Sequence, residues 1–125
     1  NCARLAALRR TEEQLAGLEK ALEQMEKDIA NGVLGEAADM SFHFHVALAT
    51  NNSLLIRLMN TIAESIHENL KKNRIILFST PGTPERLLRE HRAIYQAIKA
   101  QSPQEAESYM HRHLELVQEE MSFGK

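Results

Sequence analysis

The chain has 125 residues, of which 43% are hydrophobic and 26% are charged, and 15 Lys and Arg against 17 Asp and Glu leave a net charge of −2. This length predicts one domain, residues 1–125, with a single hydrophobic core. The near-balanced charge argues against direct binding of nucleic acid, which needs a clustered basic excess.

The cysteine content and the length of the apolar runs exclude further classes of protein. Cys2 is the single cysteine, so an intrachain disulfide is excluded. No apolar run approaches the roughly 18 residues that cross a bilayer, and no secretory signal opens the chain. Because no signal or membrane span is found, we expect a cytoplasmic protein with no membrane contact. Because the sequence starts without Met, we expect it to be a fragment of a longer protein.

The first third of the chain carries two helix signals. Leu5 and Leu8 are typical of the end of a helix, and residues 11–14 (Thr-Glu-Glu-Gln) have the pattern of a capping box. From there apolar residues recur at helical spacing up to Asn31-Gly32, which is typical of a left-handed helix stop. We expect a helix between these two signals.

Helix signals continue to the end of the chain. Residues 51–53 (Asn-Asn-Ser) predict a break and a new cap, residues 79–84 a loop, and Ser102-Pro103 a helix start. The helices expected after Gly32 cover about residues 36–50, 53–78, 85–100 and 103–121. No segment alternates with the period of a strand, and short connections favour antiparallel neighbours, so we predict an all-α antiparallel bundle of about five to six helices.

Ionisable residues interrupt the apolar stripes of three expected helices. His91 stands at the centre of the stripe Leu87, Leu88, Ile94, Tyr95 and Ile98, and His113 at the centre of the stripe Ala106, Met110, Val117 and Met121. In the helix at 36–50, Asp39 and His43 are four residues apart and therefore share one face. Such groups are costly in an apolar interior unless they are paired or bind a metal.

Each of these four residues also has a structural explanation. A core imidazole can bond a carbonyl or a Tyr hydroxyl, and Asp39 can be a first-turn residue that the helix dipole favours. Taken together, three imidazoles and one carboxylate suit zinc, nickel, manganese or another first-row divalent ion. We predict a divalent metal site, with zinc as the expected ion, formed by Asp39, His43, His91 and His113.

The other three histidines are not expected to be ligands. His111 shares its face with Glu107 and Glu115, which predicts a solvent-facing side chain. His45 and His67 lie on the flanks of their helices, although a shift of register would bring His45 into the place of His43.

Four short motifs follow one another along the chain: DMSFH at 39–43, ATNNSLL at 49–55, EHRAIYQAI at 90–98 and AESYMHRHL at 106–114. In this order they resemble the FCD domain, the ligand-binding half of FadR-type regulators in the GntR superfamily. The first resembles its D-x-x-F-H signature, the second its A-x-x-N-x-x-L turn and the last its A-x-x-x-M-x-x-H-L element. The resemblance spans nearly the whole chain.

The resemblance implies an effector-sensing domain in a transcriptional regulator. In that family the domain is joined to an N-terminal winged helix-turn-helix that binds operator DNA as a dimer. We therefore expect a homodimer that contacts operator DNA only through that N-terminal domain, which this sequence lacks. The metal-binding members use one Asp and three His, and their motif positions fall on the same four residues; the acyl-CoA-responsive members lack this set, which argues against an acyl-CoA sensor.

A small organic acid is the expected effector, because its carboxylate would fill positions left open on the ion. In the helix at 53–78, Asn69 and Asn73 interrupt the apolar stripe Leu55, Met59, Ile62 and Ile66. Arg74 stands on the flank of that stripe, where it could pair with a carboxylate. Interhelical hydrogen bonds for the two Asn, and a surface position for Arg74, are the alternatives.

Two other functions remain open from the sequence. A metal-dependent enzyme would use the same ligands, but no further carboxylate or histidine is obviously placed as a general base, so we expect no enzyme. A purely structural helical dimerisation module with polar core residues is the second alternative.

Overall fold

The computed structural model describes residues 2–123, apart from the side chains of residues 64, 66, 67, 70 and 120–123. These residues form helices and no strand, which confirms the all-α prediction. The helices are α1 (Cys2–Arg9), α2 (Glu12–Ala30), α3 (Glu36–Ala49), α4 (Ser53–Leu77), α5 (Thr83–Lys99) and α6 (Pro103–Phe123). None of the described helices is long and apolar enough to span a membrane.

The helix boundaries follow the local signals closely. Thr11 caps α2 with both hydrogen bonds of a capping box, and Gly32 has the left-handed φ of 69° that ends this helix. Asn52 caps α4 by accepting from two backbone N–H groups of its first turn.

The predicted start of α5 is wrong by two residues. The helix begins at Thr83, directly after Gly82, whose φ is 87°. Pro84 lies in the first turn, where its missing N–H has no intrahelical acceptor to lose, so the proline does not delay the helix.

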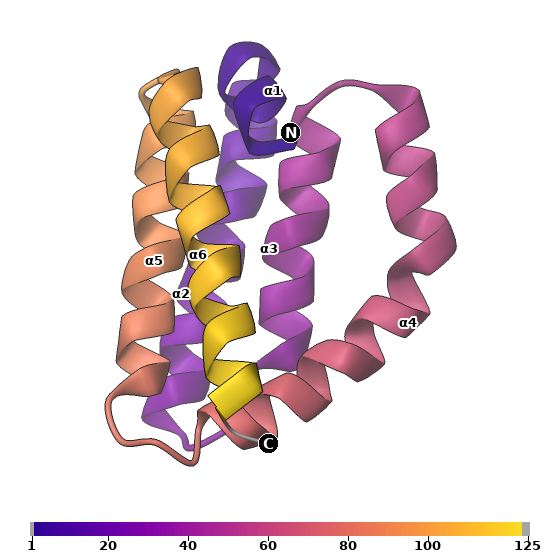
Figure 1. The fold of residues 1–125 in the computed structure, drawn as a ribbon. Helices are drawn as coiled ribbons and strands as arrows, with labels where there is room; N and C mark the ends of the chain where they lie inside the picture. The colour runs from indigo at the N-terminus through magenta and orange to yellow at the C-terminus, as the bar shows by residue number, and fades with distance from the viewer. Residues whose placement is uncertain (1, 124–125) are drawn as a thin grey trace.

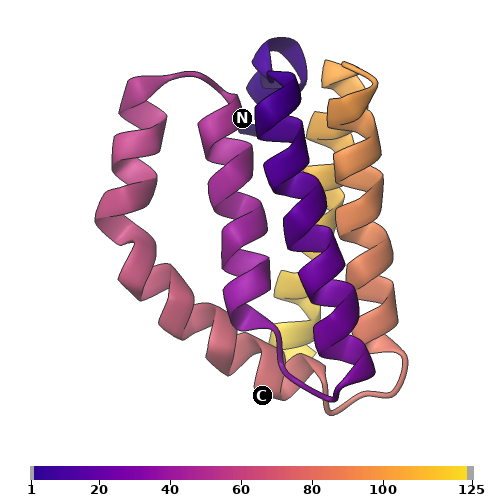
Figure 2. The same cartoon turned by 180° about the vertical axis from the view of Figure 1, so that it is seen from behind.

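The core lies between α1, α2, α3, α5 and α6, whose mutual contacts form the bundle seen from both sides in Figures 1 and 2. The predicted inward stripe of α5 is buried, including His91, while Leu88 is partly buried. In α6 the inward Ala106, Met110 and His113 are buried and Val117 is half-buried; Met121 lies outside the described side chains. Helices α5 and α6 therefore each place a buried histidine in the bundle.

Helix α4 departs from the rest of the bundle. It bows outward over its first half and returns beneath the bundle towards α5 (Figure 1). Its apolar stripe is not buried over the described part: Leu55 and Met59 are half-buried, and Ile62 is 42% exposed. The side chain of Ile66 lies outside the described residues. Helical spacing shows that one face is apolar, but the core is already closed by the other helices.

Candidate metal centre

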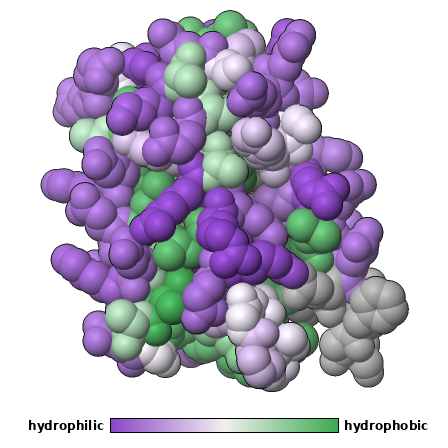
Figure 3. Space-filling model, turned by 90° about the vertical axis from the view of Figure 1, so that its left-hand side faces the viewer, coloured by the Kyte–Doolittle hydropathy of each residue, from purple (hydrophilic) through white to green (hydrophobic). Residues whose placement is uncertain are grey.

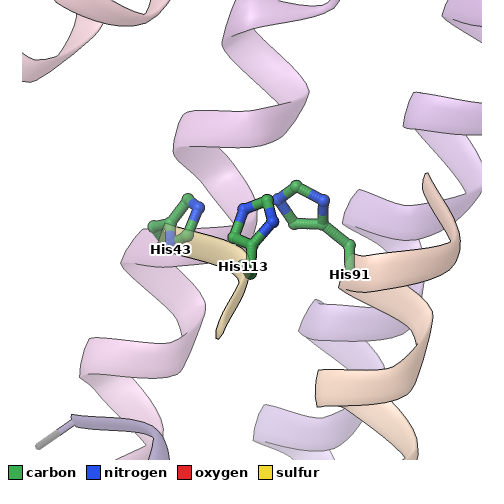
Figure 4. Close-up of side chains that lie close together, drawn as sticks. All are labelled: His43, His91 and His113. Carbon is green, nitrogen blue, oxygen red and sulfur yellow. The ribbon is translucent and has the colours of Figure 1, made fainter. Parts of the chain in front are cut away.

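The four side chains singled out by the sequence lie together in the middle of the bundle. Asp39 and His43 come from α3, His91 from α5 and His113 from α6. Figure 4 shows the three imidazoles converging, and each offers a nitrogen within 4.8 Å of those of the other two. Asp39 Oδ1 lies 3.0 Å from His91 Nε2 and 3.1 Å from His43 Nε2.

These distances have the size expected between ligands of one ion. Two atoms that each lie about 2.1 Å from a first-row ion are about 3.0 Å apart at neighbouring octahedral positions. Asp39 Oδ1 meets this spacing with both histidine nitrogens that it faces. The three histidines could therefore hold a metal ion, and the carboxylate is placed beside two of them.

Hydrogen bonds from the opposite side of two rings fix which nitrogen faces the centre. His91 Nδ1 donates to the Leu87 carbonyl at 2.7 Å, because a carbonyl oxygen can only accept. His113 Nδ1 lies 2.5 Å from Glu90 Oε1 and donates to this carboxylate. Both rings therefore turn Nε2 towards the centre, the orientation typical of metal-binding histidines, and the Nε2 of His91 faces Asp39 Oδ1 there.

Glu90 is a residue that the sequence analysis missed. From the sequence no further carboxylate was obviously placed at the site, but Glu90 is half-buried at the edge of the α5 stripe and contacts His113. Arg86, one turn earlier, pairs with Glu90 at 2.9 Å. The position of Glu90 directly before His91 could have indicated a place near the site. Its contact with His113 was not predictable, because it depends on how α6 packs against α5.

Arg74 is buried beside the cluster, so the surface alternative for this residue is wrong. Its Nε donates to Asp39 Oδ2 at 3.1 Å, and its Nη1 donates to the Leu34 carbonyl at 2.7 Å. The guanidinium also lies 5.1 Å from the centre of the Phe78 ring. Arg74 thus ties the end of α4 to α3 and to the turn before it.

A small cavity of about 130 Å³ opens next to the cluster. Two of the residues named from the α4 sequence, Asn73 and Arg74, line it, whereas Asn69 is exposed and stands outside the lining. The lining combines polar groups on the metal-centre side with an apolar wall: Asp39, His43, Asn73, Arg74, Leu77, Leu87, His113, Leu114 and Val117.

The electrostatic surroundings set the charge of three groups. Burial alone would raise the pKa of Asp39, but hydrogen bonds from His43 and His91 outweigh it and hold that pKa well below its usual value. Burial would also raise the pKa of Glu90, and the His113 hydrogen bond lowers it. Burial lowers the pKa of His113 despite Glu90. Two anionic carboxylates and a neutral His113 are the protonation states that metal binding requires.

The remaining histidines lie away from the centre or outside the description. His111 is exposed and lies 3.5 Å from Glu115, which confirms its predicted solvent-facing position. His45 bonds the Ser41 carbonyl through Nδ1, and its ring packs where a Cβ on Gly17 would come within 2.4 Å. The side chain of His67 lies outside the described residues.

Comparisons with known proteins identify the family of this chain. The family model of the FCD domain matches residues 1–116. The HTH-type transcriptional regulator LutR of Bacillus subtilis is 40% identical over 121 residues, covering 96% of this chain and 55% of LutR. The Uxu operon transcriptional regulator of Escherichia coli is 29% identical over 132 residues, covering 97% of this chain and 48% of that protein.

The chain therefore spans about half the length of the curated relatives it matches. Both relatives are named as transcriptional regulators. With the helical bundle, the buried cluster and the family match together, the chain belongs to the FCD domain family of GntR-type transcriptional regulators.

Proposed function

We propose that this chain is the ligand-sensing domain of a GntR/FadR-type regulator that acts in the cytoplasm. It binds one divalent metal ion through Asp39, His43, His91 and His113, and a small organic acid beside it. The observation that carries the proposal is the convergence of one carboxylate and three imidazoles from α3, α5 and α6 inside the bundle.

Zinc is the ion we expect, with nickel or manganese as alternatives, because imidazole and carboxylate suit all three. Such an ion would supply positive charge and coordination positions open to a carboxylate. The chain's own contribution is orientation: Leu87 and Glu90 hold two imidazoles with Nε2 inward, and Arg74 holds the Asp39 carboxylate.

The cavity beside the cluster supports a small carboxylate as the effector. Arg74 and Asn73 offer a cation and an amide to the oxygens of an acid. Leu77, Leu87 and Val117 form an apolar wall that suits a short carbon chain. A volume of about 130 Å³ suits a small acid better than a large one.

Regulation would follow from the difference in affinity between two arrangements of the helices. A ligand shifts such an equilibrium only by as much as it binds one state better. Because α3, α4, α5 and α6 all line the cavity, an acid held there draws them together. In the intact homodimer this change would reach operator DNA through the N-terminal domain.

Calorimetric titration of the chelator-treated, tag-free chain with zinc tests the metal centre. We expect about one ion per chain, loss of binding in His91→Ala, and unchanged binding in His111→Ala, which alters an exposed histidine outside the cluster. Equal binding by both variants would contradict the proposal.

A second titration tests the effector. Metal-loaded and metal-free chain are each titrated with acetate, lactate, pyruvate and citrate. We expect heat from at least one acid, only with the metal-loaded chain, and weaker binding in Asn73→Ala. If the metal binds and no acid gives heat, the ion is a structural element of the bundle and the sensing role fails.

A further inference from the structure

The apolar wall of the cavity lies on one side of the metal centre. Leu87 lies one turn before His91 in α5, and Val117 lies one turn after His113 in α6. Because these two helices run antiparallel (Figure 1), both apolar residues lie on the same side of the histidines. Leu77, in the last turn of α4, completes the wall. An acid whose carboxylate reaches the metal centre therefore has its far end against aliphatic side chains.

The described residues around the cavity provide few partners for a second charge. Arg74 is the one cation among the described lining residues. Its Nε and Nη1 already donate to Asp39 and to the Leu34 carbonyl. The nearby Lys71 and Lys72 are exposed and stand outside the lining. The positive charge available to an acid is therefore concentrated on the side of the metal centre.

Burial makes the apolar wall unfavourable for a carboxylate. Leu77 and Leu87 are only 4% and 3% exposed, so little water reaches them. By contrast, the surface on the side opposite the first half of α4 is mostly hydrophilic (Figure 3). An ionised group placed against buried aliphatic side chains loses its water without gaining a partner, which is costly. A methyl group in the same place is stabilised, because it leaves water.

We propose that the cavity selects acids with one carboxylate and an uncharged aliphatic tail, and rejects acids that carry a second carboxylate at the far end. The carboxylate lies at the metal centre, near Asn73 and Arg74, and the tail lies along the apolar wall. The inference rests on the proposed function, since it needs the effector site, and it names the class of acid that the site takes. The wall, rather than the metal ligands, makes the distinction.

Leu114 is the position at which this selectivity can be changed. It lines the cavity and is 53% exposed, so it stands where the cavity meets solvent. Leu114 and Val117 are three residues apart and share one face of α6. An arginine at position 114 would therefore bring a cation to the far end of a bound acid without burying it in the core. Such a cation can pair with a second carboxylate.

Calorimetric titration of the zinc-loaded chain with butyrate and with succinate tests the proposal. The two acids have equally long carbon chains, and they differ in whether the far end is a methyl group or a carboxylate. We expect the wild-type chain to bind butyrate at least about tenfold more tightly than succinate. Leu114→Arg should bind succinate about tenfold more tightly than the wild type does.

Tyr109→Arg is the matched control, because Tyr109 lies on the same helix, is 42% exposed and stands outside the lining. It should leave both affinities unchanged, and one bound zinc per chain in each variant shows that the bundle is intact. Wild-type chain that binds succinate as tightly as butyrate overturns the proposal, and so does Leu114→Arg that gains no more affinity for succinate than the control. If pyruvate binds and butyrate does not, this inference alone fails; if no acid binds at all, the proposed sensing function fails with it.

Discussion

Helices α5 and α4 are both amphipathic, yet their apolar faces have different fates. The stripe of α5 is buried around His91, which itself has no exposed surface. The first half of α4 leaves Leu58 exposed, while its last turns bury the charged Arg74. Helical spacing of apolar residues therefore identifies an apolar face, but it does not show which part of the molecule buries that face.

The largest expected effect comes from neutralising the Asp39 carboxylate, which contacts Arg74 of α4 and His91 of α5. Asp39→Asn leaves Arg74 buried without its carboxylate, and breaking a buried pair costs about 3–5 kcal/mol. Urea unfolding of the metal-free chain measures the free energy of unfolding. Glu36→Gln, in the first turn of the same helix, is the control, with an expected cost of about 0.3–1 kcal/mol. If Asp39→Asn costs no more than this control, the buried contact does not stabilise the junction of α3 and α4.

Truncation of one aliphatic residue in α5 and one in α4 compares how much each apolar face contributes to the free energy of unfolding. Ile94→Ala in α5 creates a cavity in the closed core and should cost about 2–5 kcal/mol. Leu58→Ala should cost about 0.5 kcal/mol or less when unfolding is measured on dilute, monomeric chain. Similar costs at the two positions would show that α4 is covered within one copy.

Loss of Glu90 tests how α5 and α6 orient the metal centre. Glu90→Ala removes the acceptor that holds His113 Nδ1, so zinc affinity should fall about 10–100-fold. Calorimetry measures the change, with the exposed Glu85→Ala in the same helix as control. Unchanged affinity would mean that His113 needs no orienting carboxylate.

The smallest effect is a pH dependence of the metal-free chain. Burial lowers the pKa of His113 in the folded state, so between that value and about 6.5 the unfolded chain binds a proton that the folded chain does not. The free energy of unfolding should therefore fall as the pH drops through this window. Urea titrations at several pH values should show a shallower slope for His113→Asn than for His111→Asn. Equal slopes would contradict a buried neutral imidazole.

The sequence predicted the local features of the fold well. The capping box at Thr11, the break at Asn52 and the stripe around His91 depend on residues within one or two turns, and the structure confirms them. The proximity of Asp39 and His43 was also predictable, because residues four apart share one face of a helix; that His91 and His113 join them was expected from their central places in the stripes of two other helices. Their role as metal ligands stays a prediction.

The contacts between distant helices were not predictable in the same way. Arg74 reaches Asp39 across 35 residues, and Glu90 reaches His113 across 23. Both pairings depend on the rotation of one helix against another, which a single apolar stripe does not define. The exposure of Leu54, Leu58 and Ile62 on α4 escaped prediction for the same reason.

X-ray absorption spectroscopy of the tag-free chain, loaded with one equivalent of zinc, reports directly whether the three imidazoles bind one ion. The account predicts nitrogen and oxygen neighbours at about 2.0–2.2 Å with the scattering pattern of three imidazoles, reduced by one imidazole in His113→Ala. A spectrum without imidazole neighbours, or one that His113→Ala leaves unchanged, would contradict it.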